Sequence, residues 1–166
     1  LDSILCFGDS TASVAYSFTG GLAPYNVDLY DSSMNLIQAS TFLQDTILNL
    51  KSGKYYLIVN DSNLCSWSDS ITISEPLDIS ITLNIEASVA CYGGNDGEIS
   101  VEFIGGTSPY SIAWYDSSMG VLQQSSSVSA NYDTIKALVS GKYFFELIDS
   151  FGCASLDSIV ISQNDS

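Results

Sequence analysis

The feature of this sequence that most constrains its fold is an internal repeat. Three motifs recur in the same order 85 residues later: Cys6-Phe7-Gly8 as Cys91-Tyr92-Gly93, Gly20-Gly21-x-x-Pro24-Tyr25 as Gly105-Gly106-x-x-Pro109-Tyr110, and Tyr30-Asp31-Ser32-Ser33-Met34 as Tyr115-Asp116-Ser117-Ser118-Met119. Three further motifs recur 88 residues later: Asp45-Thr46-Ile47 as Asp133-Thr134-Ile135, Ser52-Gly53-Lys54-Tyr55 as Ser140-Gly141-Lys142-Tyr143, and Asp69-Ser70-Ile71 as Asp157-Ser158-Ile159. Such self-similarity is typical of tandem copies of one structural unit.

The change of offset from 85 to 88 gives the second copy three extra residues. They fall in the Ser-rich stretch 125–130, where we expect a surface loop, because loops tolerate changes of length. Residues 79–86 alternate apolar and polar side chains, which predicts an opening strand of the second copy. The first copy begins without its counterpart. We therefore predict two domains, residues 1–77 without a first strand and residues 78–166, cut from a longer run of such modules.

Hydrophobic patterning predicts an all-β fold. Apolar side chains alternate along residues 12–18, and further short strands are expected at 25–30, 45–50, 54–60 and 69–74. Strands at this spacing, with turn residues between them, indicate a sandwich or a barrel. Apolar residues make up 46% of the chain and charged residues 14%, which argues against disorder.

Two matching motifs favour the sandwich. Leu50-x-x-Gly53-x-Tyr55 and Leu138-x-x-Gly141-x-Tyr143 are typical of the corner of an immunoglobulin-like sandwich, where a tyrosine hydroxyl bonds to upstream backbone. We therefore predict two tandem immunoglobulin-like β-sandwich repeats, with Tyr55 and Tyr143 in structural roles.

The four cysteines are placed alike in the two copies and suggest an oxidising compartment. Four cysteines allow three pairings. We predict Cys6 with Cys65 and Cys91 with Cys153, because each module should close by itself with one disulfide. Four buried free thiols are the alternative. Zinc is disfavoured, since the chain has no histidine and no Cys-x-x-Cys motif.

The net charge of −15 excludes two classes of partner. The only cations are four lysines, whereas nucleic acids and anionic lipids attract clusters of Lys and Arg. We therefore expect no nucleic acid partner and no direct insertion into a membrane, and no stretch approaches the roughly 20 apolar residues of a membrane span.

These motifs, together with an Asp-rich turn before the second cysteine and a closing strand that ends at Glu75-Pro76, resemble the SprB repeat. SprB-type repeats are modules of very large cell-surface adhesins of gliding and related Bacteroidota. The resemblance implies a non-catalytic structural or adhesive module at the cell surface, exported across the outer membrane. Its implied partners are neighbouring repeats of the same chain, surface polysaccharide, or copies of itself in a filament.

Aspartate is unusually often followed by a hydroxyl residue, since 11 of the 14 aspartates precede Ser or Thr. Several of these pairs continue with an apolar residue, which resembles the acceptor sequence for O-glycosylation of exported proteins in Bacteroidota. The candidate acceptors are Ser3, Ser10, Thr46, Ser70, Thr134 and Ser158. The alternative is that Asp-Ser pairs start strands and that the duplication inflates their number.

No arrangement of residues predicts catalysis, because without histidine a serine has no ordinary base. No cofactor is predicted. Calcium is an alternative for the acidic turns at Asn95–Glu98, Asp61 and Asp149, although they lack EF-hand spacing. Two other functions remain alternatives: an accessory domain of a secreted enzyme, and a carbohydrate-binding module with aromatic platforms. The platform residues would be Trp67, Trp114 or Tyr115, with core burial expected for Trp114.

Overall fold

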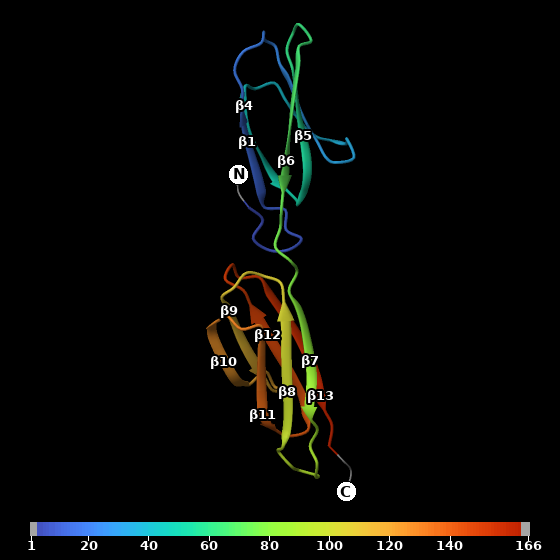
Figure 1. The fold of residues 1–166 in the computed structure, drawn as a ribbon, viewed down its shortest axis with the longest axis vertical. Coiled ribbons are helices and arrows are strands. Elements are labelled where there is room, and N and C mark those ends of the chain that lie inside the picture. Colours follow the sequence, from blue (N-terminus) through green and yellow to red (C-terminus); the bar gives the residue numbers. More distant parts are fainter. Residues whose placement is uncertain (1–2, 164–166) are drawn as a thin grey trace. The chain divides into compact units, whose positions relative to one another are not determined.

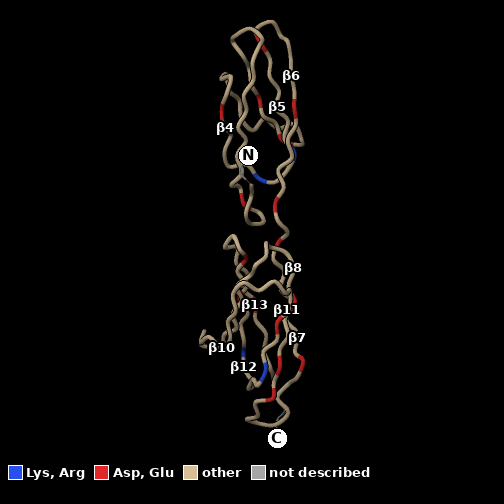
Figure 2. Tube along the Cα trace, turned by 60° about the vertical axis from the view of Figure 1, so that its left-hand side comes forward, with Lys and Arg blue, Asp and Glu red and all other residues tan. Residues whose placement is uncertain are grey.

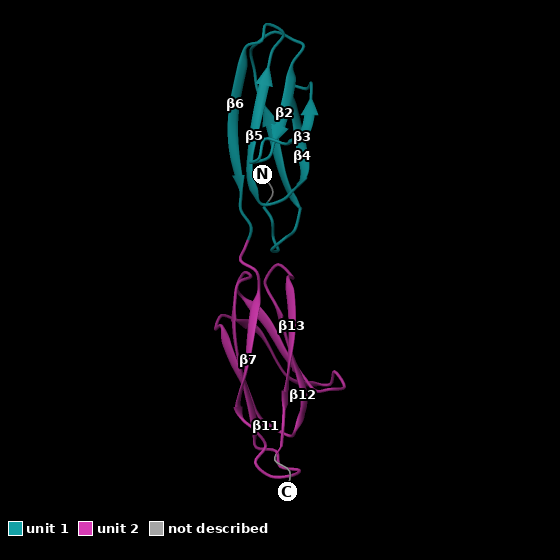
Figure 3. Ribbon diagram, turned by 90° about the vertical axis from the view of Figure 1, so that its right-hand side faces the viewer, with its two compact units in different colours: residues 1–75 teal, residues 76–166 magenta. Residues whose placement is uncertain are grey.

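The computed structural model describes residues 3–163, and the regular elements among them are β-strands (Figure 1). The chain divides into two compact units, Leu1–Glu75 and Pro76–Ser166 (Figure 3). The sequence places this division two residues further on. Each unit has its own core and is described separately below.

Within residues 3–75, unit 1 contains six strands in two sheets. The strands are β1 (Ala12–Ser17), β2 (Asn26–Tyr30), β3 (Leu36–Ser40), β4 (Gln44–Leu50), β5 (Gly53–Asn60) and β6 (Ser66–Ile73). One sheet has the order β1-β4 and the other the order β3-β2-β5-β6, with every pair antiparallel. Buried residues of both sheets form one cluster, so the sheets pack face to face.

Unit 2 repeats this plan with one additional strand. Its strands are β7 (Ser80–Ala87), β8 (Gly97–Ile104), β9 (Tyr110–Tyr115), β10 (Val121–Val128), β11 (Tyr132–Leu138), β12 (Gly141–Ile148) and β13 (Ala154–Ile161). The sheet orders are β11-β8-β7 and β10-β9-β12-β13, and the additional strand is β7. Two packed antiparallel sheets of this kind make an immunoglobulin-like sandwich, which confirms the predicted fold class.

The alternation of side chains accounts for the core. In β8 the inward residues Ile99, Val101 and Phe103 are almost fully buried, while the residues between them face outward. The side chain of Trp114 is fully buried, with its ring centroid 4.8 Å from that of Phe145. Burial of Trp114 in the core therefore agrees with the expectation from the sequence.

Two edge strands have no counterpart among the expected elements. These are β3 and β10, whose side chains are mostly exposed and show no apolar alternation. The prediction of a surface loop at 125–130 is partly wrong, because Ser125–Val128 belongs to β10. The extra residues lengthen an edge strand, where the pairing register shifts between Ser125 and Val128 and Ser127 has a positive φ.

The tyrosine corner is present in both units. The Tyr55 hydroxyl donates a hydrogen bond to the Lys51 carbonyl oxygen at 3.1 Å, and the Tyr143 hydroxyl donates to the Val139 carbonyl oxygen at 2.9 Å. Both rings are buried. The pKa of Tyr143 is raised, and burial of its hydroxyl group is the main reason. These tyrosines therefore fix the corner where the chain passes from one sheet to the other.

Four hairpin turns share one backbone conformation. Each begins with an aspartate, and three residues later the chain takes a positive φ, at Met34, Leu64, Met119 and Gly152. Left-handed backbone is strained for side chains with a Cβ and relaxed for glycine. Leu64 is 86% exposed and therefore gains little from packing.

We predict that Leu64→Gly stabilises unit 1 by about 1 kcal/mol, because it relieves the left-handed strain. The reverse change, Gly152→Leu, should destabilise unit 2 by a similar amount, since a Cβ there meets no atom within 4 Å and the cost is conformational. Urea unfolding of both variants measures the two effects. Changes of the same sign would contradict this account.

Candidate functional site

The ends of each unit hold the residues that the repeat preserves. We call the end formed by residues 5–9 and Glu75 the exit end of unit 1, and the end formed by Gly20–Tyr25 and Asp61–Cys65 its entry end. In unit 2 the corresponding segments are residues 90–94 with Gln163 at the exit end, and Gly105–Tyr110 with Asp149–Cys153 at the entry end.

The two cysteines of unit 1 lie at opposite ends. Gly8, two residues after Cys6, donates its N–H to the Glu75 carboxylate at 2.7 Å, which places Cys6 at the exit end. Cys65 immediately precedes β6, whose eight residues lead away from the entry end. At about 3.3 Å per residue, that strand separates the cysteines by roughly 25 Å. A disulfide needs Cα atoms within about 7 Å, so the predicted Cys6–Cys65 bond is wrong.

Unit 2 has the same arrangement. Gly93, two residues after Cys91, donates its N–H to the Gln163 side-chain oxygen at 3.2 Å, and Cys153 precedes the eight-residue strand β13. The predicted Cys91–Cys153 bond is wrong for the same reason. Cys65 and Cys91 are exposed free thiols, whereas Cys6 and Cys153 are disulfide-bonded. The expectation that each module closes on itself by a disulfide is therefore corrected.

An aspartate organises the entry end of each unit. The Asp149 carboxylate accepts hydrogen bonds from the N–H groups of Phe151 and Cys153 in its own turn, both at 2.9 Å. Its other oxygen accepts the Thr107 N–H, also at 2.9 Å, and Asp149 is only 6% exposed. Asp61 has the same role in unit 1, with Asn63, Cys65 and Leu22 as donors.

The Gly-Gly-x-x-Pro-Tyr motif forms the other half of the entry end. The Tyr25 hydroxyl donates to the Gly20 carbonyl oxygen at 3.0 Å, and Tyr110 bonds Gly105 in the same way at 2.9 Å. Gly105 has a φ of +83°, and a Cβ there would lie 1.8 Å from the Asp78 carbonyl oxygen. Glycine is therefore required where the chain enters unit 2. The prolines of both motifs follow cis peptide bonds.

Three of the Asp-Ser or Asp-Thr pairs lie on edge strands. Asp45, Asp69 and Asp157 each accept a hydrogen bond from the N–H of the next residue, at 2.7–2.8 Å. Their strands β4, β6 and β13 are at the edges of their sheets. Four more pairs begin the hairpin turns, where the aspartate accepts N–H groups two and four residues later. Backbone hydrogen bonding thus accounts for seven of the eleven pairs.

The candidate acceptor residues differ in exposure. The side chains of Ser3, Ser10, Thr46 and Ser70 are exposed, and those of Thr134 and Ser158 are half-buried. Ser70 lies outward on β6 while Ile73 is buried, as the strand alternation predicts. Glycosylation at these positions stays a prediction.

Asp133, which precedes one candidate acceptor, has a further role. Its carboxylate accepts hydrogen bonds from the Trp114 indole N–H and the Gln123 side-chain amide, both at 2.9 Å. The buried indole therefore has the partner that its polar atom needs. Leu29 stands in the place of Trp114 in unit 1, where no such bond is needed.

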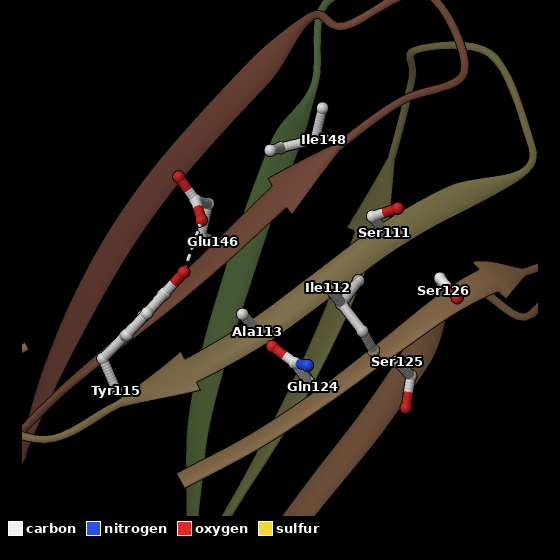
Figure 4. A pocket seen from close by; sticks show the side chains of 9 residues that line it. All are labelled: Ser111, Ile112, Ala113, Tyr115, Gln124, Ser125, Ser126, Glu146 and Ile148. Carbon is white, nitrogen blue, oxygen red and sulfur yellow. Dashed lines mark hydrogen bonds between the residues drawn. The ribbon is translucent and has the colours of Figure 1, made fainter. Parts of the chain in front are cut away.

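A groove of about 370 Å³ lies on the outer face of the four-stranded sheet of unit 2 (Figure 4). The Tyr115 hydroxyl donates to the Glu146 carboxylate at 2.7 Å, and small side chains from Ser111 and Ala113 leave the space beside it. The hydrogen bond with Glu146, followed by burial, raises the pKa of Tyr115. Tyr115 and the half-exposed Trp67 remain available as platforms, whereas the buried Trp114 does not.

Acidic side chains are spread over both units, while the four lysines are few and scattered (Figure 2). Within residues 3–163, no three His, Cys, Asp or Glu side chains are grouped as a metal site. In the turns weighed for calcium, Asp61 and Asp149 already accept backbone N–H groups. The part of the chain that the structure describes contains no helix long and apolar enough to span a membrane.

A family model described as the SprB repeat matches residues 85–119. The resemblance seen in the sequence is thereby confirmed over this stretch, which runs from the end of β7 to the turn after β9. The same motifs in unit 1 extend it there as a prediction. The family match and the sandwich fold together support an extracellular repeat module and indicate a structural, non-catalytic domain. No curated protein sequence matches the chain.

Solved structures with a similar fold come from varied proteins. The IG1 and IG2 domains of DIP-gamma are 15% identical, with 93% of this chain and 90% of that chain covered and a TM-score of 0.49. Three N-terminal domains of the highly immunogenic outer capsid protein of bacteriophage RB49 are 14% identical to this chain. The match covers 97% of this chain and 56% of that chain, with a TM-score of 0.46. The BSP domain of a biofilm-associated protein is 18% identical to this chain. The match covers 99% of this chain and 29% of that chain, with a TM-score of 0.36. These likenesses concern the fold alone.

We predict that Asp149→Ala lowers the free energy of unfolding of unit 2 by about 3 kcal/mol, because three backbone N–H groups lose their acceptor in a buried site. Asp116→Ala is the matched control, since it removes two similar bonds from an exposed turn and should cost much less. Urea unfolding of both variants in the reduced state measures the difference. Equal losses would show that the entry end does not depend on Asp149.

The stability of unit 1 should fall in acid. Hydrogen bonds lower the pKa of three carboxyl groups in this unit. The main donor is the Cys65 N–H for Asp61, the Asn35 side chain for Asp31, and the Ser52 hydroxyl for Glu75. Because the folded pKa is below the unfolded value of about 4, this stability is present above that pH and is lost as the pH falls through the folded pKa.

We therefore expect the urea midpoint of unit 1 to be level near neutral pH and to fall between about pH 5 and about pH 2. Amide signals of unit 1 measured across this range provide the midpoint. Glu75→Gln should reduce the slope, because its amide cannot gain a proton. An unchanged slope in that variant would exclude Glu75 as a contributor.

Proposed function

We propose that this chain, whose residues 85–119 match the SprB repeat, is a non-catalytic structural and adhesive segment of a large bacterial cell-surface protein. Its repeats act in series. The outer membrane is the export route that the resemblance implies. Neighbouring repeats of the same chain are the first partners of each unit.

The placement of the four cysteines carries this proposal. Cys6 lies two residues before Gly8, whose N–H donates to Glu75, the last residue of unit 1. Cys153 belongs to the turn held by Asp149, whose neighbour Gly106 donates its N–H to the Leu77 carbonyl oxygen at 2.8 Å. Cys6 therefore lies at the exit end of unit 1, and Cys153 lies at the entry end of unit 2. Both cysteines are disulfide-bonded.

The other two cysteines extend the same scheme. Cys65 occupies the entry end of unit 1 and Cys91 the exit end of unit 2, and both are exposed free thiols. In a longer array each would pair with the neighbouring repeat on its side. Formation of each bond removes two protons and two electrons from a pair of thiols. The acceptor is a disulfide, either that of an oxidoreductase or that of an oxidised small molecule such as glutathione disulfide, which is reduced to two thiols.

No residue is assigned to catalysis in this function. The Tyr115 hydroxyl and the Glu146 carboxylate are bonded to each other, and the sequence offers no histidine as a base. Ser70 and Thr46 lie on edge strands and have exposed side chains. A sugar attached to either side chain would extend into solvent. The mechanical role requires only that the units stay folded and joined.

Oxidised glutathione added to the concentrated chain should produce a ladder of disulfide-linked oligomers on a non-reducing gel. The reason is that Cys65 of one molecule can pair with Cys91 of the next, as successive repeats would. Cys65→Ser and Cys91→Ser are matched controls, and each alone should stop the ladder at dimers.

Peptide mapping without reduction should also recover Cys6 and Cys153 in disulfide-linked peptides, and Cys65 and Cys91 as free thiols, in the monomer. A Cys6–Cys65 peptide, or free alkylated thiols at all four positions, would overturn the proposed series. Maps of the protein from its source test the acceptor sites as well, by added hexose-type mass on the peptides that contain Thr46 or Ser70.

A further inference from the structure

Unit 1 contains an open groove between its two sheets. The groove has a volume of about 400 Å³ and runs between β1, from Val14 to Phe18, and β6, from Trp67 to Ile71. Leu29 and Leu57 line it from the second sheet, so it reaches the edge of the core. An opening of this kind leaves apolar side chains of the core partly in contact with water.

The equivalent space in unit 2 is filled by a strand. There β7 pairs with β8 in antiparallel register, with Leu83 opposite Val101 and Ile81 opposite Phe103. Ile81 and Leu83 of β7, and Ile79 just before it, pack against the core cluster, and β7 also contacts β13. By the repeat offsets, β1 and β6 of unit 1 correspond to β8 and β13. The groove therefore lies where unit 1 would hold a β7-type strand.

The backbone of β1 presents unused hydrogen-bonding groups to this groove. Phe18 donates its N–H to the Leu43 carbonyl oxygen at 3.1 Å, on the side of β4. Because successive residues of a strand point their backbone groups to opposite sides, the N–H and C=O groups of Ala15 and Ser17 are directed away from β4. Within the described residues, β4 is the one strand that pairs with β1.

Tyr16, which also lines the groove, supports the same conclusion. Its hydroxyl oxygen is buried and has no hydrogen-bond partner among the described residues. Buried tyrosine hydroxyls are ordinarily paired. A strand in the groove would bring backbone carbonyl groups to this part of the sheet.

We propose that the groove of unit 1 binds a β7-type strand, which is an extended segment with apolar residues at alternate positions. The strand runs antiparallel to β1 and leads directly into residue 1. The register of unit 2 places the counterpart of Ile85 opposite Val14, that of Leu83 opposite Tyr16 and that of Ile81 opposite Phe18. In a longer array, each repeat would then be completed by the segment that joins it to the repeat before.

The test is to graft residues 77–85 of this chain directly before Leu1 in the full-length protein. At the repeat offset of 85, this graft restores the spacing that unit 2 has between β7 and β8. The midpoint of thermal unfolding of unit 1 should rise by roughly 5 °C or more. Hydrogen exchange of the Ala15 and Ser17 amides should slow at least tenfold, because the added strand protects them.

Two controls separate strand docking from a general effect of added residues. A graft with Ile81→Asp and Leu83→Asp keeps the length but removes the apolar side chains, so it should raise neither the midpoint nor the protection. Ala15→Pro removes one N–H on the open side of β1, where the side chain is exposed, and should cancel most of the gain in the grafted protein.

The result decides between two states of unit 1. An unchanged midpoint with unprotected Ala15 and Ser17 amides would overturn the proposal and show that the open edge of unit 1 is its complete form. A gain that the doubly substituted graft reproduces would overturn it as well. The proposal is independent of the cysteine series, because the experiment can be carried out on the reduced protein.

Discussion

The entry end of each unit depends on one carboxylate that is bonded entirely by backbone N–H groups. In unit 2, Asp149 joins its own turn to Thr107, which lies 42 residues away in the sequence. A buried carboxylate is tolerated only when such donors surround it. Gly106 permits this contact, since a Cβ there would lie 3.2 Å from the Asp149 side chain. The Gly-Gly-x-x-Pro-Tyr motif and the acidic turn before the second cysteine are therefore two halves of one contact, and the position of Cys153 follows from it.

Much of the fold could be predicted from the sequence, because local patterns determine it. Alternation identified the buried strands, and the Leu-x-x-Gly-x-Tyr motif identified the corner at Tyr55. The edge strands β3 and β10 could not be found in this way, since exposed strands carry no apolar alternation. The unrecognised strand β3 also hides from the sequence why the predicted disulfides are wrong. Five strands separate Cys6 from Cys65, and an odd number of strands takes the chain to the opposite end of the sandwich. Without β3 the number is even, which places both cysteines at one end.

The two copies solve the same packing problems with different residues. In unit 2 the Trp114 indole is satisfied by Asp133, whereas unit 1 has Leu29 at that place and a larger residue, Tyr16, on the facing strand. On the outer sheet, Tyr115 bonds Glu146 of β12, while Tyr30 bonds Asp28 of its own strand at 3.4 Å. The positions opposite these acids in the neighbouring strands are Ala113 and Ile58. Each copy therefore keeps one acidic side chain beside its tyrosine, but on a different one of the two paired strands. Comparing the two copies residue by residue would not show this.

The aspartates on edge strands have a consequence for a surface crowded with many such units. Exposed strand edges pair readily with one another, and tethering many copies side by side raises their local concentration far above that of free protein. On β4, β6 and β13, a carboxylate occupies the backbone N–H of the following residue and leaves negative charge along the edge. This negative charge would repel a second strand edge of the same kind. Copies of this chain held side by side would therefore keep their sheets separate.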